Sequence, residues 1–402
     1  MLRFAMKYDF DRVINRTKTN SIKWNKHFLK EYFETDDVLP LWVADMDFQC
    51  PQPVIDALKE RIAEEIYGYS WHKIPPYLDA VANWMKRRHD WEINNEWIVF
   101  SPGIVPAIYM LIQTFVNIGE KIIIQPPVYR PFFTGIRNNG RQVLINQLKY
   151  ENKKYSIDFE DFEEKAKDPL SKMFILCSPH NPVGRVWSEK ELKKLGDICL
   201  ENEILIVSDE IHHDLILSGY NHTLFSTISE EFEKNTIMCT APSKTFNTAG
   251  LQTSNIIIPD KKKRDAFINT IDHRNGVELP NPFGVVALIA AYNEGKDWLS
   301  QVLEYIEANF KYLKKFVDEH LPDIDFIDPE GTYLAWLDFR KLGMNDKELR
   351  EFMLKKAKVA LDDGSNFGPG GEGFERINVG CPRSLLKECM MRIVNALNEK
   401  ST

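Results

Sequence analysis

Short apolar runs alternate with amphipathic stretches between residues 97 and 260 of this 402-residue chain. The runs lack the regular polar alternation of a half-exposed strand, so they predict strands that are buried on both faces. Strands are expected at 97–100, 121–125, 143–147, 173–177, 204–207, 236–239 and 255–258. Because strands that alternate with helices favour a mostly parallel sheet covered by helices, the pattern predicts an α/β fold.

The pattern changes after residue 285, where long amphipathic stretches replace the short runs. Helices are predicted at 51–66, 76–90, 284–319, 346–358 and 384–398, and a further strand at 332–337. A chain of this length favours two domains. We expect a large domain over residues 51–285 and a smaller α+β domain built from residues 1–50 and 286–402.

Composition argues against several classes of partner and location. The net charge of −8 argues against nucleic acid. No apolar stretch is long enough to span a membrane, and the first six residues lack the apolar core of a signal peptide. The six cysteines are scattered without a Cys-x-x-Cys pair, which is typical of a reducing, cytoplasmic location and not of a disulfide framework.

Three polar residues follow successive predicted strands. Asn181 comes after the run ending at Cys177, Asp209 after the run ending at Val207, and Lys244 after the run ending at Cys239. Ligands of α/β sheets bind at the carboxyl ends of the strands. A lysine that forms a Schiff base, with an acid paired to a pyridinium nitrogen, is the chemistry of pyridoxal phosphate (PLP), which the three residues together predict as the cofactor.

Other strand ends carry weaker signals. Gly103, Ile104 and Val105 open a predicted helix, whose free N–H groups suit a phosphate. Tyr129 either stacks on a flat cofactor ring or packs at the edge of the sheet. Arg383 is the best candidate for gripping a substrate carboxylate through two hydrogen bonds, the alternative being a surface arginine before the last helix.

Two histidines, His212 and His213, follow Asp209 closely. Zinc ligands on a helix favour a spacing of four residues, and adjacent side chains point to different faces, so we expect no metal site. His212 is expected near the cofactor. Asp214 is expected to be an ordinary surface acid.

Residues 364–373 are rich in glycine and cannot form a helix, so they predict a loop. These glycines do not open a helix after a buried strand, as the glycines of phosphate-binding fingerprints do. The sequence leaves open whether this loop only connects two elements or faces the substrate.

These motifs resemble those of a known family. The segments that carry the resemblance are Leu41–Phe48, Tyr67–Ser70, Cys177–Gly184, Ser208–His212, Ser243–Asn247, Tyr333–Asp338 and Asn378–Ser384. They are similar to fold-type I PLP enzymes of the class I/II aminotransferase superfamily, and most similar to its cystathionine β-lyase-like carbon–sulfur lyase branch. The resemblance implies the PLP-dependent transferase fold, with a mostly parallel seven-stranded sheet in the large domain and a smaller α+β domain.

The resemblance also implies roles for single residues. Lys244 would be the Schiff-base lysine and catalytic base, and Asp209 the partner of the pyridine nitrogen. Further cofactor contacts would come from Gly103, Ile104, Val105, Tyr129, Asn181, His212 and Ser243. Arg383, with Tyr129 and Asn181, would bind the substrate. Tyr69 would reach the cofactor of a neighbouring subunit, which implies a homodimer.

Departures from the general aminotransferase pattern bear on the reaction. His212 stands where many aminotransferases have a tyrosine, and Gln252 where they often have a phosphate-binding arginine. We therefore expect a PLP-dependent β-lyase that cleaves sulfur amino acids such as cystathionine to pyruvate, ammonia and a thiol. An aminotransferase with the same cofactor remains an alternative, as does a regulatory protein that binds a transcription factor and retains lyase activity.

Overall fold

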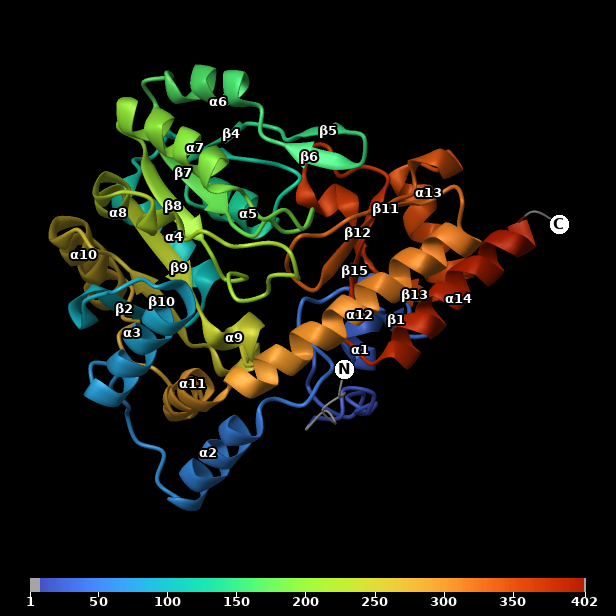
Figure 1. Ribbon diagram of the computed structural model, residues 1–402, viewed down its shortest axis with the longest axis horizontal. Coiled ribbons are helices and arrows are strands. Elements are labelled where there is room, and N and C mark those ends of the chain that lie inside the picture. Colours follow the sequence, from blue (N-terminus) through green and yellow to red (C-terminus); the bar gives the residue numbers. More distant parts are fainter. Residues whose placement is uncertain (1–7, 401–402) are drawn as a thin grey trace.

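The computed structural model describes residues 8–400 and contains a mixed sheet of seven strands, covered by helices on both faces (Figure 1). Its strands in spatial order are β2 (Ile98–Ser101), β10 (Ser254–Ile257), β9 (Thr236–Thr240), β8 (Leu205–Asp209), β7 (Ser171–Cys177), β3 (Lys121–Ile124) and β4 (Gln142–Ile145). Strand β10 runs antiparallel to both of its neighbours, and the other six strands run in one direction. All seven predicted strands are confirmed, with ends shifted by at most two residues.

Alternate residues of each strand enter different cores, which explains the unbroken apolar runs. In β3, Ile122 and Ile124 pack in one core and Ile123 in another. The helices that contribute to the first core are α4 (Ile104–Phe115), α5 (Pro131–Asn138) and α10 (Lys261–Ile268). Those on the opposite face are α3 (Pro75–His89), α6 (Phe159–Ala166), α7 (Glu189–Glu201), α8 (Glu230–Asn235) and α11 (Pro282–Glu294).

A second, antiparallel sheet lies in the C-terminal part of the chain. Its order is β11 (Asp325–Ile327), β12 (Leu334–Asp338), β15 (Phe374–Asn378) and β14 (Asp362–Asp363). The neighbouring helices are α1 (Lys26–Phe33), α12 (Lys296–His320), α13 (Asp346–Glu351) and α14 (Arg383–Lys400). The N-terminal strand β1 (Leu39–Pro40) pairs with β13 (Val359–Ala360), so the N-terminal segment joins this part of the molecule. The domain boundaries themselves stay a prediction.

The helical stretches predicted at 284–319 are confirmed as two helices, α11 and α12, separated at Gly295. A Cβ atom on Gly295 would lie 2.4 Å from the Ala291 carbonyl oxygen and 2.5 Å from the ring of Phe246. The close approach of Phe246 therefore requires glycine at the bend. Long α12 continues from this bend and packs along α14 (Figure 1).

Further elements are the helix α2 (Gln52–Ala63), the short helix α9 (Pro242–Thr245) and the hairpin of β5 (Lys149–Glu151) and β6 (Lys154–Ser156). Across residues 8–400, no helix has the length and apolar character that crossing a membrane requires.

Candidate active site

A cavity of about 510 Å³ lies at the carboxyl ends of the central strands. Residues 103–105, at the start of α4, form one part of its lining. Tyr129 follows β3, Asn181 follows β7, Asp209 ends β8, and Lys244 lies on the short helix after β9. The structure thus brings together these sequence-predicted residues, because parallel strands end at one edge of a sheet.

Lys244 reaches across the cavity wall to the N-terminal segment. Its Nζ donates a hydrogen bond to the carbonyl oxygen of Ala44 at 2.7 Å. Burial lowers the pKa of Lys244 to about 8, with Arg376 acting in the same direction and the carboxylates of Asp45 and Asp209 opposing it. About a tenth of this amine is therefore neutral at pH 7, far more than for an ordinary lysine, and is available as a nucleophile or base.

Asp209 is a buried carboxylate that forms no ion pair among the described residues. Its Oδ1 accepts a hydrogen bond from the Ile211 N–H at 3.2 Å, and only 4% of the residue is exposed. Burial raises the pKa of Asp209 to about 7, and Lys244 offsets this only in part. A buried carboxylate is costly unless it is paired, so a cationic group in the cavity would stabilise it.

His212 and Ser243 also line the cavity, as expected. Burial lowers the pKa of His212 well below its usual value, so the ring is neutral near pH 7. Its Nδ1 is buried and has no hydrogen-bond partner among the described residues. Gln252 lies in the same wall. The cavity therefore contains an unsatisfied polar atom of the kind that a bound molecule can satisfy.

Arg376 is a buried arginine of this cavity that no sequence pattern indicated. Its Nη1 donates to Oδ1 of Asn181 at 3.0 Å, and its Nη2 donates to the Trp42 carbonyl oxygen at 2.8 Å and to Oδ2 of Asp362 at 2.5 Å. Its Nε is buried and unpartnered within the described chain. Arg376 lies on β15, where Glu375, Arg376 and Asn378 are buried although polar. The hydrophobic pattern therefore did not reveal this strand.

Arg383, which was expected to bind the substrate carboxylate, does not line the cavity. Its Nε donates to Oδ1 of Asn309 at 2.5 Å, and its guanidinium lies over the ring of Tyr312, 5.0 Å from the centroid. The expectation for Arg383 is wrong because its side chain is directed toward α12.

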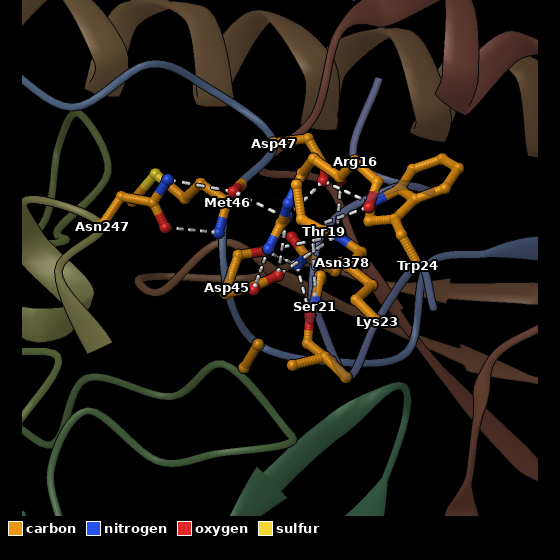
Figure 2. A network of polar contacts seen from close by, with 12 residues as sticks. Arg16, Thr19, Ser21, Lys23, Trp24, Asp45, Met46, Asp47, Asn247 and Asn378 are labelled. Carbon is orange, nitrogen blue, oxygen red and sulfur yellow. Dashed lines mark hydrogen bonds and ion pairs between the residues drawn. The ribbon is translucent and has the colours of Figure 1, made fainter. Parts of the chain in front are cut away.

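The loop at 43–47 forms the side of the cavity that faces Lys244, and a polar network holds it in place (Figure 2). Arg16 pairs with Asp45 at 2.6 Å and with Asp47 at 2.7 Å. The fully buried Lys23 pairs with Asp47 at 2.6 Å. These ion pairs connect the N-terminal segment to the loop, and neither Arg16 nor Lys23 carries a sequence signal of this role.

Two asparagines hold the backbone of the same loop (Figure 2). The Asn247 side chain donates to the carbonyl oxygens of Met46 and Phe48 at 3.0 and 2.9 Å. The Asn378 side chain donates to those of Val43 and Asp45 at 2.6 Å each. Asn247 lies three residues after Lys244 and Asn378 two residues after Arg376, so both amides fix the loop relative to the cavity.

The glycine-rich loop faces the cavity, which answers the question that the sequence left open. Asn366 and Phe367 line the cavity, and the Phe367 carbonyl accepts a hydrogen bond from the Val128 N–H at 2.8 Å. Gly368 has a φ of +86°, and a Cβ atom there would lie 2.4 Å from the ring of Phe133. Both the backbone conformation and the close packing therefore require glycine at this position.

Two further expectations have different outcomes. Tyr69 is 97% exposed and does not line the cavity of its own chain. Its role at a neighbouring subunit stays a prediction.

The expectation that Asp214 is a surface acid is wrong, because Asp214 is fully buried and accepts hydrogen bonds from Nε1 of Trp84 at 3.1 Å and Oγ1 of Thr245 at 2.9 Å.

Comparisons with known proteins cover nearly the whole chain. The sequence model for aminotransferase class I and II matches residues 36–393. Cystathionine beta-lyase PatB of Bacillus subtilis (strain 168) is 47% identical over 390 residues, covering 97% of this chain and 100% of that protein.

Solved structures that contain PLP also match nearly the whole chain. A PLP-bound protein of Clostridium difficile 630, described as an aminotransferase, has a TM-score of 0.95 at 47% identity, covering 97% of this chain and 100% of the other. Cystalysin from Treponema denticola, which contains a pyridoxal 5'-phosphate cofactor, has a TM-score of 0.94 at 41% identity, covering 98% and 100%.

Proposed function

Because the chain belongs to the aminotransferase class I and II family, we propose that it is a PLP-dependent carbon–sulfur β-lyase acting on sulfur-bearing L-amino acids such as cystathionine. The observation that carries this proposal is that a reactive amine and a buried carboxylate line the same cavity. Lys244 offers an amine with a lowered pKa, and Asp209 offers a buried carboxylate that forms no ion pair among the described residues. The name of the PatB relative supports the lyase reaction.

The residues of the cavity fit this cofactor. Lys244 would hold it covalently, and Asp209 would pair with the protonated ring nitrogen. Asn181 and Tyr129 would contact the ring. The start of α4 would bind the phosphate through free N–H groups, together with Ser243. When bound, PLP supplies an electron sink for the Cα carbanion.

Arg376 binds the substrate α-carboxylate in this proposal. Asn181 and Asp362 hold the guanidinium in orientation, and its unpartnered Nε retains a donor. A planar guanidinium suits a carboxylate because it can donate two parallel hydrogen bonds. The α-carbon of the substrate is thereby presented to Lys244 in the same cavity.

Lys244, once the substrate amine has released it from its bond to the cofactor, would act as the general base at Cα. Its pKa of about 8 makes the neutral amine accessible near neutral pH, while the protonated form remains a competent acid. The electron pair of the broken Cα–H bond expels the sulfur from Cβ as a thiolate. The remaining three-carbon product hydrolyses to pyruvate and ammonia.

The second candidate is an aminotransferase, which the description of the Clostridium difficile structure favours. The two reactions differ in their need for a keto acid. We expect purified protein and cystathionine alone to give pyruvate and free thiol over many turnovers. A stall after one equivalent of substrate, relieved by 2-oxoglutarate, would support the aminotransferase. Lys244→Ala should be inactive, and the exposed-site variant Lys262→Ala should match the wild type.

We also propose a homodimer in which Tyr69 enters the neighbouring subunit's site. Apolar side chains are exposed around it, with Ile66 75% and Tyr67 54% exposed. Exposed apolar patches of this kind are typical of protein interfaces. All six cysteines are free thiols, which fits a cytoplasmic location.

A further inference from the structure

A second cluster of ligating side chains lies outside the active-site cavity, where α3 ends against the turn after β8. His89 is the last residue of α3, and His213 and Asp214 belong to the turn. One ligand atom from each lies within 4.8 Å of the other two. Nε2 of His89 is 3.2 Å from Oδ1 of Asp214, and Nε2 of His213 is 3.3 Å from Oδ2.

Hydrogen bonding leaves one atom of this cluster unsatisfied. Nδ1 of His213 lies 2.5 Å from the Glu210 carbonyl oxygen, so Nδ1 carries the proton. Nε2 is buried and has no hydrogen-bond partner within the described chain, although it lies 3.3 Å from Oδ2 of Asp214. A carbonyl that fixes Nδ1–H and leaves Nε2 for an ion is the usual arrangement of a metal-bound histidine.

The cluster has a route to solvent. His89 and His213 line a cavity of about 440 Å³ together with His222. Glu304 and Glu307 line the same cavity and add negative charge to its wall. An ion could therefore enter from this side, and waters of the cavity could complete its coordination.

Neutral donors already orient Asp214 from behind. Trp84 and Thr245 donate to its Oδ2, as metal-binding carboxylates are commonly oriented by outer hydrogen bonds. Arg88 is the competing cation, with Nε 3.3 Å from Oδ1. Its side chain is 39% exposed, so it can turn into solvent when an ion binds.

We propose that His89, His213 and Asp214 form a binding site for a divalent transition-metal ion, with Zn²⁺ as the best match. Two imidazoles and one carboxylate are ligands that zinc accepts, leaving a fourth position for water. The ion would connect α3 to the turn after β8. Through the Asp214–Thr245 hydrogen bond it would also brace the residue next to Lys244. The site is structural, since these ligands do not line the active-site cavity.

Equilibrium dialysis of the cofactor-loaded protein against ZnCl₂ tests the proposal. We expect a single zinc ion per chain, with an affinity that falls at least about tenfold in His89→Gln and in His213→Gln. The matched control His27→Gln changes an exposed histidine and should bind as the wild type does. Absence of stoichiometric zinc in the wild type, or equal affinity in folded His89→Gln, would overturn the proposal.

A second variant distinguishes a metal site from an ion pair between protonated His213 and Asp214. Arg88→Gln removes the competing cation, so zinc should bind more tightly than to the wild type. Zinc should also raise the Tm of the wild type and of Arg88→Gln, because a ligand that binds only the folded state stabilises it. An ion pair takes up no zinc in either protein, and that result would refute the site without relying on the histidine variants.

Discussion

The guanidinium of Arg376 donates a hydrogen bond to the side-chain oxygen of Asn181 at 3.0 Å. Asn181 follows β7 of the large sheet, whereas Arg376 lies on β15 of the smaller one. A substrate gripped by Arg376 would therefore lie between the two sheets. This contact links the proposed carboxylate site to the proposed ring site.

Arg376→Lys should weaken substrate binding far more than Arg383→Lys. Loss of charge-assisted hydrogen bonds at a buried site costs about 2–3 kcal/mol, or roughly 30–150-fold in kcat/KM. Steady-state kinetics with cystathionine measure the difference, and Arg383→Lys serves as the control outside the cavity. A larger loss in Arg383→Lys would return the carboxylate role to that residue.

Lys244 should set the pH dependence of cofactor capture by the apoprotein. Its pKa of about 8 predicts that the rate of covalent attachment rises to about pH 8 and then levels off, instead of rising toward the usual 10.5. Visible absorbance after PLP addition follows the rate. Because Arg376 lowers this pKa, Arg376→Gln should move the plateau to higher pH. If the pH of the plateau is unchanged, the charge of Arg376 does not affect the pKa of Lys244.

Asp209→Asn should lower turnover by raising the activation free energy by about 2–4 kcal/mol, comparable to loss of a preorganised donor. Steady-state kinetics measure this loss.

In the apoprotein the same substitution should increase the stability of the fold. Folding raises the pKa of Asp209 from 3.8 to about 7, so the folded state binds more protons between these values, and this group's contribution to stability is lost as pH rises. The apo variant should therefore be more stable than apo wild type at pH 8, as denaturant unfolding would show. Equal stability would indicate that Asp209 is solvated.

Asp214→Asn should lower stability strongly. Removing one member of a buried charged network costs about 3–5 kcal/mol. The matched control Asp56→Asn, at an exposed position of α2, should stay within about 0.5 kcal/mol of the wild type. Urea unfolding measures both. Comparable small losses would mean that Trp84, Thr245 and the histidines are satisfied without this carboxylate.

Mixing inactive subunits tests the shared site. Lys244→Ala and Tyr69→Ala proteins should each have little activity, while exchanged hybrid dimers carry one intact site and recover a part of it. Size-exclusion chromatography and a tagged subunit establish that exchange occurred. If exchange is complete and activity stays absent, Tyr69 does not serve the neighbouring site.

The sequence by itself determined the central sheet and the residues at its edge. Apolar runs buried on both faces have clear ends, and polar residues at those ends meet whenever the strands are parallel, so Asn181, Asp209 and Lys244 were identified from their order along the chain. The tertiary structure alone decided which arginine enters the cavity. Strand β15 carries buried polar side chains whose partners come from distant segments, and no local pattern distinguishes Arg376 from Arg383. The same reason hid the cluster around Asp214, because His89 precedes it by 125 residues and only the packing of α3 against the turn after β8 brings them together.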